Sequence, residues 1–134
     1  MQSRRAMREQ AFILLFEQSF GDEEIGAIFE RAKDSRDMAD DPRALELAAG
    51  TLSCVSDIDP IIEKNLVDRK FSRLSRAVLA TLRLALYEII YVETIDTSVA
   101  INEAVEIAKK FSTAEEAGFV NGVLGTYARS EEPK

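Results

Sequence analysis

The stretch RLSRAVLATLRLALYEIIYV, residues 73–92, decides the fold. At helical spacing its apolar side chains cover most of the circumference of one helix, whereas a surface helix carries a single apolar stripe. We therefore expect a central, buried helix over about residues 73–92, with Ser72 as its N-cap. The apolar positions are Leu74, Ala77, Val78, Leu79, Leu82, Leu84, Ala85, Leu86, Ile89 and Ile90.

Helical periodicity continues on both sides of this stretch, without convincing strand alternation. Ser3 and Thr113 stand where they can cap further helices. Asp41-Pro42 and Asp59-Pro60 each place a capping acid before a proline, an arrangement typical of a helix start. The helices expected beside the central one cover about residues 3–19, 22–38, 42–55, 60–67, 99–111 and 113–127. The sequence thus predicts an all-α protein of about seven helices.

Length and composition limit the class of protein. With 134 residues, of which 46% are hydrophobic, the chain can bury one core, or two small subdomains that share an interface. It contains no His and a single cysteine, Cys54, which excludes His-dependent catalysis, His-bearing zinc sites and an intramolecular disulfide. We expect no catalytic residues, no metal site and no cofactor.

Hydropathy also limits the location of the protein. No apolar run approaches 18 residues, and the first residues lack the apolar segment of a signal peptide. The single cysteine fits a reducing compartment. We expect a soluble, cytoplasmic protein that has no membrane partner.

Charge is distributed unevenly along this acidic chain, whose formal charge is −7. Residues 1–10 and 69–83 are basic, and residues 21–41 are strongly acidic. Two basic islands on an acidic body can provide a local site for a polyanion that the overall charge conceals. The cations of the second island are Arg69, Lys70, Arg73, Arg76 and Arg83.

The first basic island lies at the start of a predicted helix. Arg4, Arg5 and Arg8 occupy its first two turns, where the helix dipole favours acids rather than cations. These arginines therefore suggest a role other than helix stability, and phosphate binding is the obvious candidate. A solvated helix start is the alternative interpretation.

The second basic island lies on one edge of the central helix. At 100° per residue Arg73, Arg76 and Arg83 fall within a narrow arc. This edge could face RNA, or it could face an acidic segment of the same chain such as residues 21–41. Composition does not separate these two interpretations.

Two stripes of side chains have both a structural and a functional interpretation. Phe12, Phe16 and Phe20 are spaced four apart, as core residues of one helix would be, but a partly exposed ring could anchor a protein partner. Three glycines share one face of the last helix, where we expect them to permit close packing of a neighbouring backbone: Gly118, Gly122 and Gly125.

Three motifs, spread over nearly the whole chain, carry a family resemblance. The C-terminal motif is Val99-Ala-Ile-Asn-Glu-Ala-Val-Glu-Ile-Ala-Lys-Lys-Phe111, followed by Phe119-Val-Asn-Gly-Val-Leu124. The central motif is Leu82-Arg-Leu-Ala-Leu-Tyr-Glu88, and the arginine-rich start is Ser3-Arg-Arg-Ala-Met-Arg-Glu-Gln-Ala11. In this order the motifs resemble the NusB family of bacterial transcription antitermination factors.

The resemblance implies both a fold and a function. The fold is one all-α NusB-like domain over residues 1–134, with helical subdomains at about 1–70 and 71–129 and a frayed tail at 130–134. The function is not enzymatic. Family members pair with NusE, a small-subunit ribosomal protein, and the pair binds the single-stranded boxA element of ribosomal RNA transcripts. The complex helps RNA polymerase to pass terminators.

The resemblance also assigns candidate site residues. Phe16 falls where family members carry an aromatic residue at the surface that faces NusE, and Phe20 is the next aromatic of the same stripe. The candidate RNA contacts that it assigns are Arg4, Arg5, Arg8 and Arg83, and Arg76 joins them from the basic edge of the central helix. Ser98 and Gly118 stand where family members commonly carry lysine, which implies fewer phosphate contacts and a shallower salt dependence of RNA binding.

Two alternative functions keep the fold. A NusB-like domain also precedes ribosomal RNA cytosine methyltransferases, so the chain could be a detached copy of such a domain, although 134 residues leave no room for the catalytic part. The other alternative is a self-associating module, in which the arginines of one copy meet residues 21–41 of another in a homodimer.

Overall fold

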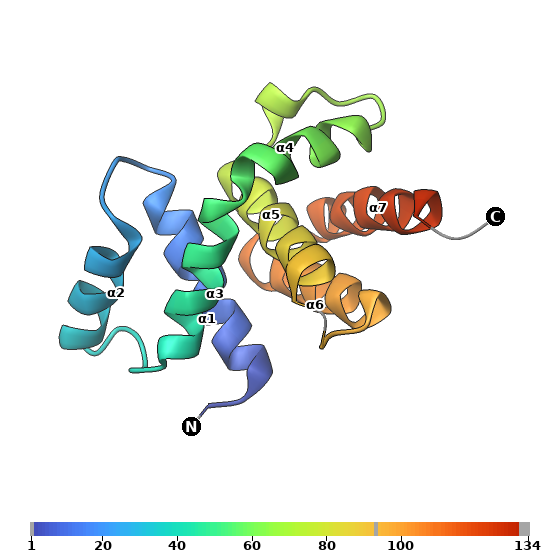
Figure 1. Cartoon of the computed structure of the whole chain (residues 1–134). Coiled ribbons are helices and arrows are strands. Elements are labelled where there is room, and N and C mark those ends of the chain that lie inside the picture. Colours follow the sequence, from blue (N-terminus) through green and yellow to red (C-terminus); the bar gives the residue numbers. More distant parts are fainter. Residues whose placement is uncertain (1, 93, 132–134) are drawn as a thin grey trace. The chain divides into compact units, whose positions relative to one another are not determined.

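The computed structural model describes residues 2–92 and 94–131, and all regular elements in these ranges are helices (Figure 1). They are α1 (Arg4–Gln18), α2 (Ile25–Asp34), α3 (Pro42–Ser53), α4 (Val55–Lys64), the short 3-10 helix η1 (Phe71–Arg73), α5 (Arg76–Tyr91), α6 (Thr97–Phe111) and α7 (Ala114–Ser130). The all-α fold class is confirmed. None of the described helices combines the length and the apolar character needed to cross a membrane.

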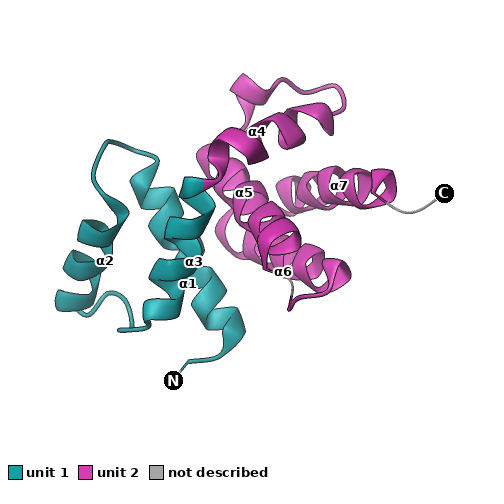
Figure 2. Ribbon diagram, in the orientation of Figure 1, with its two compact units in different colours: residues 1–53 teal, residues 54–134 magenta. Residues whose placement is uncertain are grey.

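The chain divides into two compact units, residues 1–53 and 54–134 (Figure 2). The family resemblance implied a boundary near residue 70, whereas this division groups α4 and η1 with residues 54–134. The reason is that α4 contacts α5 and so belongs to the second unit. Of the tail expected to fray, Ser130 still belongs to α7, and residues 132–134 lie outside the described residues.

The first unit consists of α1, α2 and α3, each of which contacts the other two. All of them contribute buried apolar side chains, so each shows the expected amphipathic pattern. Phe12 of α1 is only 2% exposed, which confirms it as a core residue. The other buried apolar residues include Leu15, Ile25, Ile28, Phe29, Ala44 and Ala48.

The second unit is organised around α5, which contacts α4, α6 and α7. Leu82 and Leu86 of α5 are almost fully buried, together with Ile58 and Ile62 of α4 and Val120 of α7. Because α5 has neighbours on several sides, it needs apolar residues around most of its circumference. The prediction of a central helix from residues 73–92 is confirmed within this unit.

Several predicted helix starts are confirmed by their hydrogen bonds. The Ser3 hydroxyl accepts a hydrogen bond from the Ala6 N–H at 3.1 Å, and the Thr113 hydroxyl accepts one from the Glu116 N–H at 3.0 Å. At the start of α3, the Asp41 carboxylate accepts a hydrogen bond from the Arg43 N–H at 3.1 Å. Each side chain thereby satisfies an N–H group that has no partner within its helix.

Two predicted starts are wrong, and the second helix is shorter than predicted. Residues Phe71–Arg73 form η1, and α5 is capped by Ser75 instead of Ser72, with the Ser75 hydroxyl accepting from the Val78 N–H. Pro60 lies inside α4 rather than at its start, because burial of Ile58 keeps the preceding turn helical. The second helix ends at Asp34, before Arg36, whose φ of 64° is left-handed.

The glycines of α7 do not serve close packing, contrary to the expectation from sequence. A Cβ atom built at Gly118 or Gly122 would meet no atom of the described chain within 4 Å, apart from the backbone of its own helix turns. Both residues are exposed. Glycine at these positions therefore lowers the stability of the helix, because it loses more conformational entropy on folding than alanine would. Among the described residues no close neighbour requires glycine there.

Gly118→Ala and Gly122→Ala are each expected to raise the free energy of unfolding by about 0.5–1 kcal/mol. Alanine restricts the unfolded chain, and its methyl group meets no neighbour in the helix. Urea unfolding followed by circular dichroism measures the change. Gly125→Ala is the matched control, with a smaller gain expected because its Cβ would lie 3.3 Å from Nη1 of Arg129. A loss of stability at Gly118 or Gly122 would contradict the open surroundings of these residues.

Candidate functional site

The basic start of α1, defined as Arg4, Arg5 and Arg8, is the strongest candidate for a polyanion site in the first unit. Its first turn contains no acidic residue, so the guanidinium groups add to the positive end of the helix dipole. Arg4 and Arg5 are exposed, and Arg5 also has interactions within the protein. Arg8 is only 9% exposed and has interactions within the protein. The surface of this site is therefore formed chiefly by the first two arginines.

A hydrogen-bond network that the sequence analysis missed holds the segment before α1. We call it the Gln2 clamp and define it as Gln2, Gln10, Asp41 and Arg43. Arg43 Nη2 donates to the Gln2 carbonyl at 2.8 Å, and the Gln2 amide donates to Oε1 of Gln10. Gln10 in turn donates to the carbonyl of Ala39 at 2.7 Å. The N-terminal segment is thereby joined to the connection between α2 and α3.

An ion pair forms the base of the Gln2 clamp. Arg43 Nε and Nη2 bind the two carboxylate oxygens of Asp41 at 3.0 and 2.7 Å. Asp41 is only 5% exposed. This bidentate pair holds the guanidinium in one orientation, from which it also reaches Gln2. The capping position of Asp41 was visible in the sequence, but its partnership with Arg43 and Gln2 was not.

The ion pair predicts a specific loss of stability in acid. The hydrogen bond from Arg43 holds the pKa of Asp41 at about 2, below its ordinary 3.8, and a hydrogen bond from Gln2 adds to this effect while burial opposes it. Protons therefore bind the unfolded state more readily, so the stabilisation is present above pH 4 and is lost toward pH 2.

Asp41→Asn is accordingly expected to remove about 1–2 kcal/mol of the change in unfolding free energy between pH 4 and pH 2. Urea unfolding at a series of pH values measures this difference between variant and parent. Asp40→Asn is the neighbouring control, since Asp40 is 70% exposed at its side chain and lies 3.8 Å from Lys33. The prediction would be contradicted if the unfolding free energies of the parent and of Asp41→Asn fell by the same amount between pH 4 and pH 2.

An aromatic surface lies near the end of α1. The Phe16 ring stacks on Phe12 at a centroid distance of 5.9 Å and meets Phe20 edge-on at 5.0 Å. Phe20 lies beyond the end of α1 and is 62% exposed. Phe12 thus belongs to the core, while Phe16 and Phe20 continue the stripe outward to solvent. Exposed aromatic rings of this kind favour protein contacts.

The second basic island does not form one continuous edge. Arg83 binds Asp59 of α4 in a bidentate pair, with distances of 2.8 and 2.6 Å. Arg69 binds Glu116 at 3.0 Å and lies 3.8 Å from the centroid of the Phe119 ring. Of the three arginines predicted to share an arc, Arg83 binds Asp59, and Arg73 lies in η1 rather than on the helix. Arg76 is exposed at the start of α5 and also has interactions within the protein.

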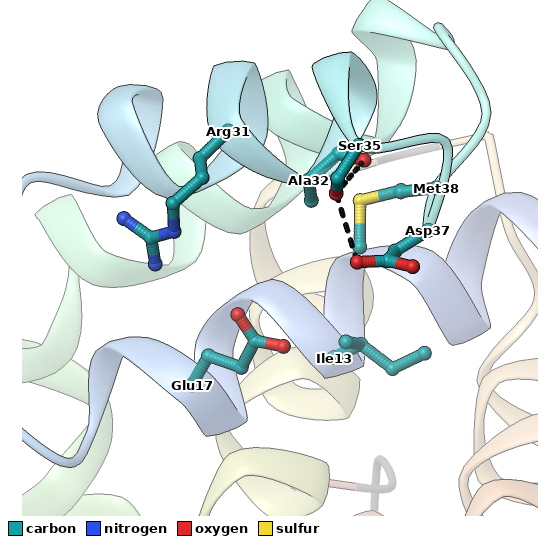
Figure 3. Close-up of a pocket in the computed structure, with 7 residues that line it drawn as sticks. All are labelled: Ile13, Glu17, Arg31, Ala32, Ser35, Asp37 and Met38. Carbon is teal, nitrogen blue, oxygen red and sulfur yellow. Dashed lines mark hydrogen bonds between the residues drawn. The ribbon is translucent and has the colours of Figure 1, made fainter.

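A pocket of about 400 Å³ lies between α1 and the end of α2 (Figure 3). The carboxylates of Glu17 and Asp37 both border it, and the Ser35 hydroxyl lies 2.8 Å from an oxygen of Asp37. Arg31, at one side, forms an ion pair with Glu23. Carboxylates repel phosphate, so this pocket is not part of the polyanion site. The remaining lining residues are Ile13, Ala32 and Met38.

Comparison with known proteins places these features in a family context. Residues 5–129 match the model of a family described as the NusB family. The chain is 40% identical over 132 residues to the transcription antitermination protein NusB of Clostridium novyi, covering 96% of this chain and 99% of that protein.

Solved structures are similar in fold. The structure of T. maritima NusB has 34% sequence identity and a TM-score of 0.84, covering 99% of this chain and 96% of that one. A chain in the crystal structure of antitermination factors NusB and NusE in complex with dsRNA has 25% identity and a TM-score of 0.83, covering 95% of this chain and 96% of that one.

Proposed function

The chain belongs to the NusB family, and on that premise we propose that it is a non-enzymatic transcription antitermination factor that binds RNA and pairs with a NusE-type ribosomal protein. The observation that carries this proposal is a similarity over nearly the full length of a relative that is named for antitermination. The solved complex of NusB, NusE and dsRNA supports RNA and a NusE-type protein as the partners.

The RNA surface in this proposal is the basic start of α1. Arg4 and Arg5 are exposed, the first turn itself contains no acidic residue, and the helix dipole adds positive potential there. The RNA is the boxA element of ribosomal RNA transcripts, read as a single strand. Single-stranded RNA exposes base edges and faces that a joint protein surface can recognise.

The remaining candidate arginines have unequal parts in this proposal. Arg76 is exposed at the first residue of α5 and can contact phosphate directly. Arg83 would reach RNA only by leaving Asp59. Arg8, at 9% exposure, supports the electrostatic potential of the site more than its contact surface.

The protein partner docks on the aromatic surface of Phe16 and Phe20. An exposed ring that rests edge-on against a second ring is a preorganised anchor, because little side-chain freedom is lost on binding. An acidic chain of formal charge −7 also suits a basic ribosomal partner, which adds positive charge for RNA. In the cytoplasm, the assembled pair would act on transcribing RNA polymerase.

The test is a titration of labelled boxA RNA with the protein, with and without the NusE-type partner. Tighter binding of boxA than of a scrambled RNA of equal length, enhanced by the partner, is the expected result. Phe20→Ala in the same assay is expected to weaken the enhancement by the partner while leaving binding by the protein alone unchanged. Equal binding of boxA and scrambled RNA in both conditions would overturn the proposal.

A further inference from the structure

The Gln2 clamp lies directly beside the proposed RNA surface. Gln2 precedes the N-cap Ser3 and stands two residues before Arg4, the first residue of α1. Its backbone carbonyl is bound by Arg43, and its side chain is bound to Gln10. A segment before a helix that lacks such contacts is less well ordered, and so is the first helical turn that follows it. The contacts therefore determine the path of the chain into α1.

The clamp joins two buried residues, Gln10 and Asp41, to two partly buried ones, Gln2 and Arg43. Gln10 and Asp41 are each 5% exposed, and Arg43 is held by both oxygens of Asp41. Breaking it would leave the buried carboxylate of Asp41 without its charged partner, which favours the clamped state. Such a clamp can hold Arg4 and Arg5 in place before RNA arrives, so that less freedom is lost on binding.

We propose that Asp41 and Arg43 are positioning residues for RNA binding, acting through the segment at Gln2 on the exposed arginines of α1. This inference rests on the proposed function, because it names what sets the affinity of the same site. Arg43 holds the Gln2 carbonyl, Asp41 orients Arg43, and neither residue contacts RNA itself.

Two simpler roles for Arg43 make different predictions. If Arg43 were itself a phosphate contact, Asp41→Asn would strengthen RNA binding, because it releases the guanidinium and removes a negative charge. If Arg43 only stabilised the fold, its variants would change unfolding but leave the RNA affinity of the folded protein unchanged. Positioning predicts that Arg43→Ala and Asp41→Asn both weaken RNA binding by the folded protein.

The experiment measures boxA RNA affinity of the full chain over a salt series. Arg43→Ala and Asp41→Asn are each expected to raise Kd about fivefold, and Arg43→Lys less, because lysine keeps the charge without the two-pronged geometry. Arg31→Ala is the matched control: it removes one cation of the same unit that is paired with Glu23, and less than a twofold change is expected.

A double-mutant cycle tests whether the clamp acts through the arginines. In an Arg4→Ala, Arg5→Ala background, Arg43→Ala is expected to change Kd less than twofold, since there is nothing left to position. An undiminished fivefold effect in that background, or stronger RNA binding by Asp41→Asn, would overturn the inference. An unchanged RNA affinity of the folded Arg43→Ala variant would also overturn it.

Hydrogen exchange separates failure of this inference from failure of the proposed function. The Met7 N–H donates to the Ser3 carbonyl at 2.9 Å, and its exchange reports whether the first turn is formed. Arg43→Ala is expected to accelerate exchange at Met7 and Ala6 without changing that of Leu15. If the parent protein binds no RNA, the proposed function is wrong, and so is the role of Asp41 and Arg43 in RNA binding. Hydrogen exchange would still decide whether the clamp orders the first turn of α1. If exchange is unchanged, the clamp itself is refuted.

Discussion

Replacing Arg4 and Arg5 together by alanine is expected to raise the Kd for boxA RNA about 10- to 100-fold and to reduce the salt slope by about 1.4. The slope follows from two lost phosphate contacts on a single strand, each worth about 0.7. Both residues are exposed at the positive end of α1, so their loss removes contacts without opening the core. Fluorescence anisotropy over a range of salt concentrations measures both quantities.

A charge-matched control distinguishes contact from general attraction. Lys109→Ala with Lys110→Ala removes two exposed cations from the last turn of α6, and the net charge changes by the same amount. This variant is expected to change Kd less than threefold, because screened charges that do not touch RNA contribute little. Equal losses for the two double variants would show that the basic start of α1 is not a specific contact surface.

Arg83→Ala is expected to lower the free energy of unfolding by about 2 kcal/mol, the second large effect. Arg83 joins α5 to Asp59 of α4 through two short hydrogen bonds, and the two side chains are only 22% and 26% exposed. Removing the guanidinium leaves the partly buried carboxylate of Asp59 without its partner. This costs more unfolding free energy than the loss of a fully exposed ion pair does. Urea unfolding measures the loss.

Further variants test whether this loss belongs to the pair. Asp59→Ala is expected to destabilise by a similar amount, and the double variant by less than the sum, with a coupling of about 1 kcal/mol or more. Arg73→Ala, at an exposed position of η1, is the control and is expected to change stability by less than about 0.5 kcal/mol. A stable Arg83→Ala variant with weakened RNA binding would instead identify Arg83 as an RNA contact.

Features that depend on neighbours along the chain were predictable. The caps Ser3 and Thr113 act within one helical turn, so residue type and spacing identify them. The apolar circumference of α5 likewise predicted a helix with several neighbours. The same local signals failed at Ser72 and at Asp59-Pro60, where more than one start is chemically reasonable. Tertiary burial of Ile58 and the cap of Ser75 decided between them.

The sequence predicted which residues make up the candidate site, but not which of their side chains are available for binding. The arginines and the aromatic stripe are visible as residue types at helical spacing. Whether a given arginine is available depends on acids far away in sequence, as with Arg83 and Asp59. The Gln2 clamp joins Gln2 to Arg43, and no pattern in the sequence marks that pair.

The helical class, the buried role of α5, the basic start of α1 and the aromatic stripe that begins on α1 could all be predicted from the order of the residues. Periodicity and capping determine such features, because they act over a few residues of one helix. The packed helices were needed to show that Arg8 is buried, that Arg83 is paired with Asp59 and that the segment before α1 is held by Arg43. Burial and ion pairing depend on which distant segments meet, and that is settled only when the helices pack.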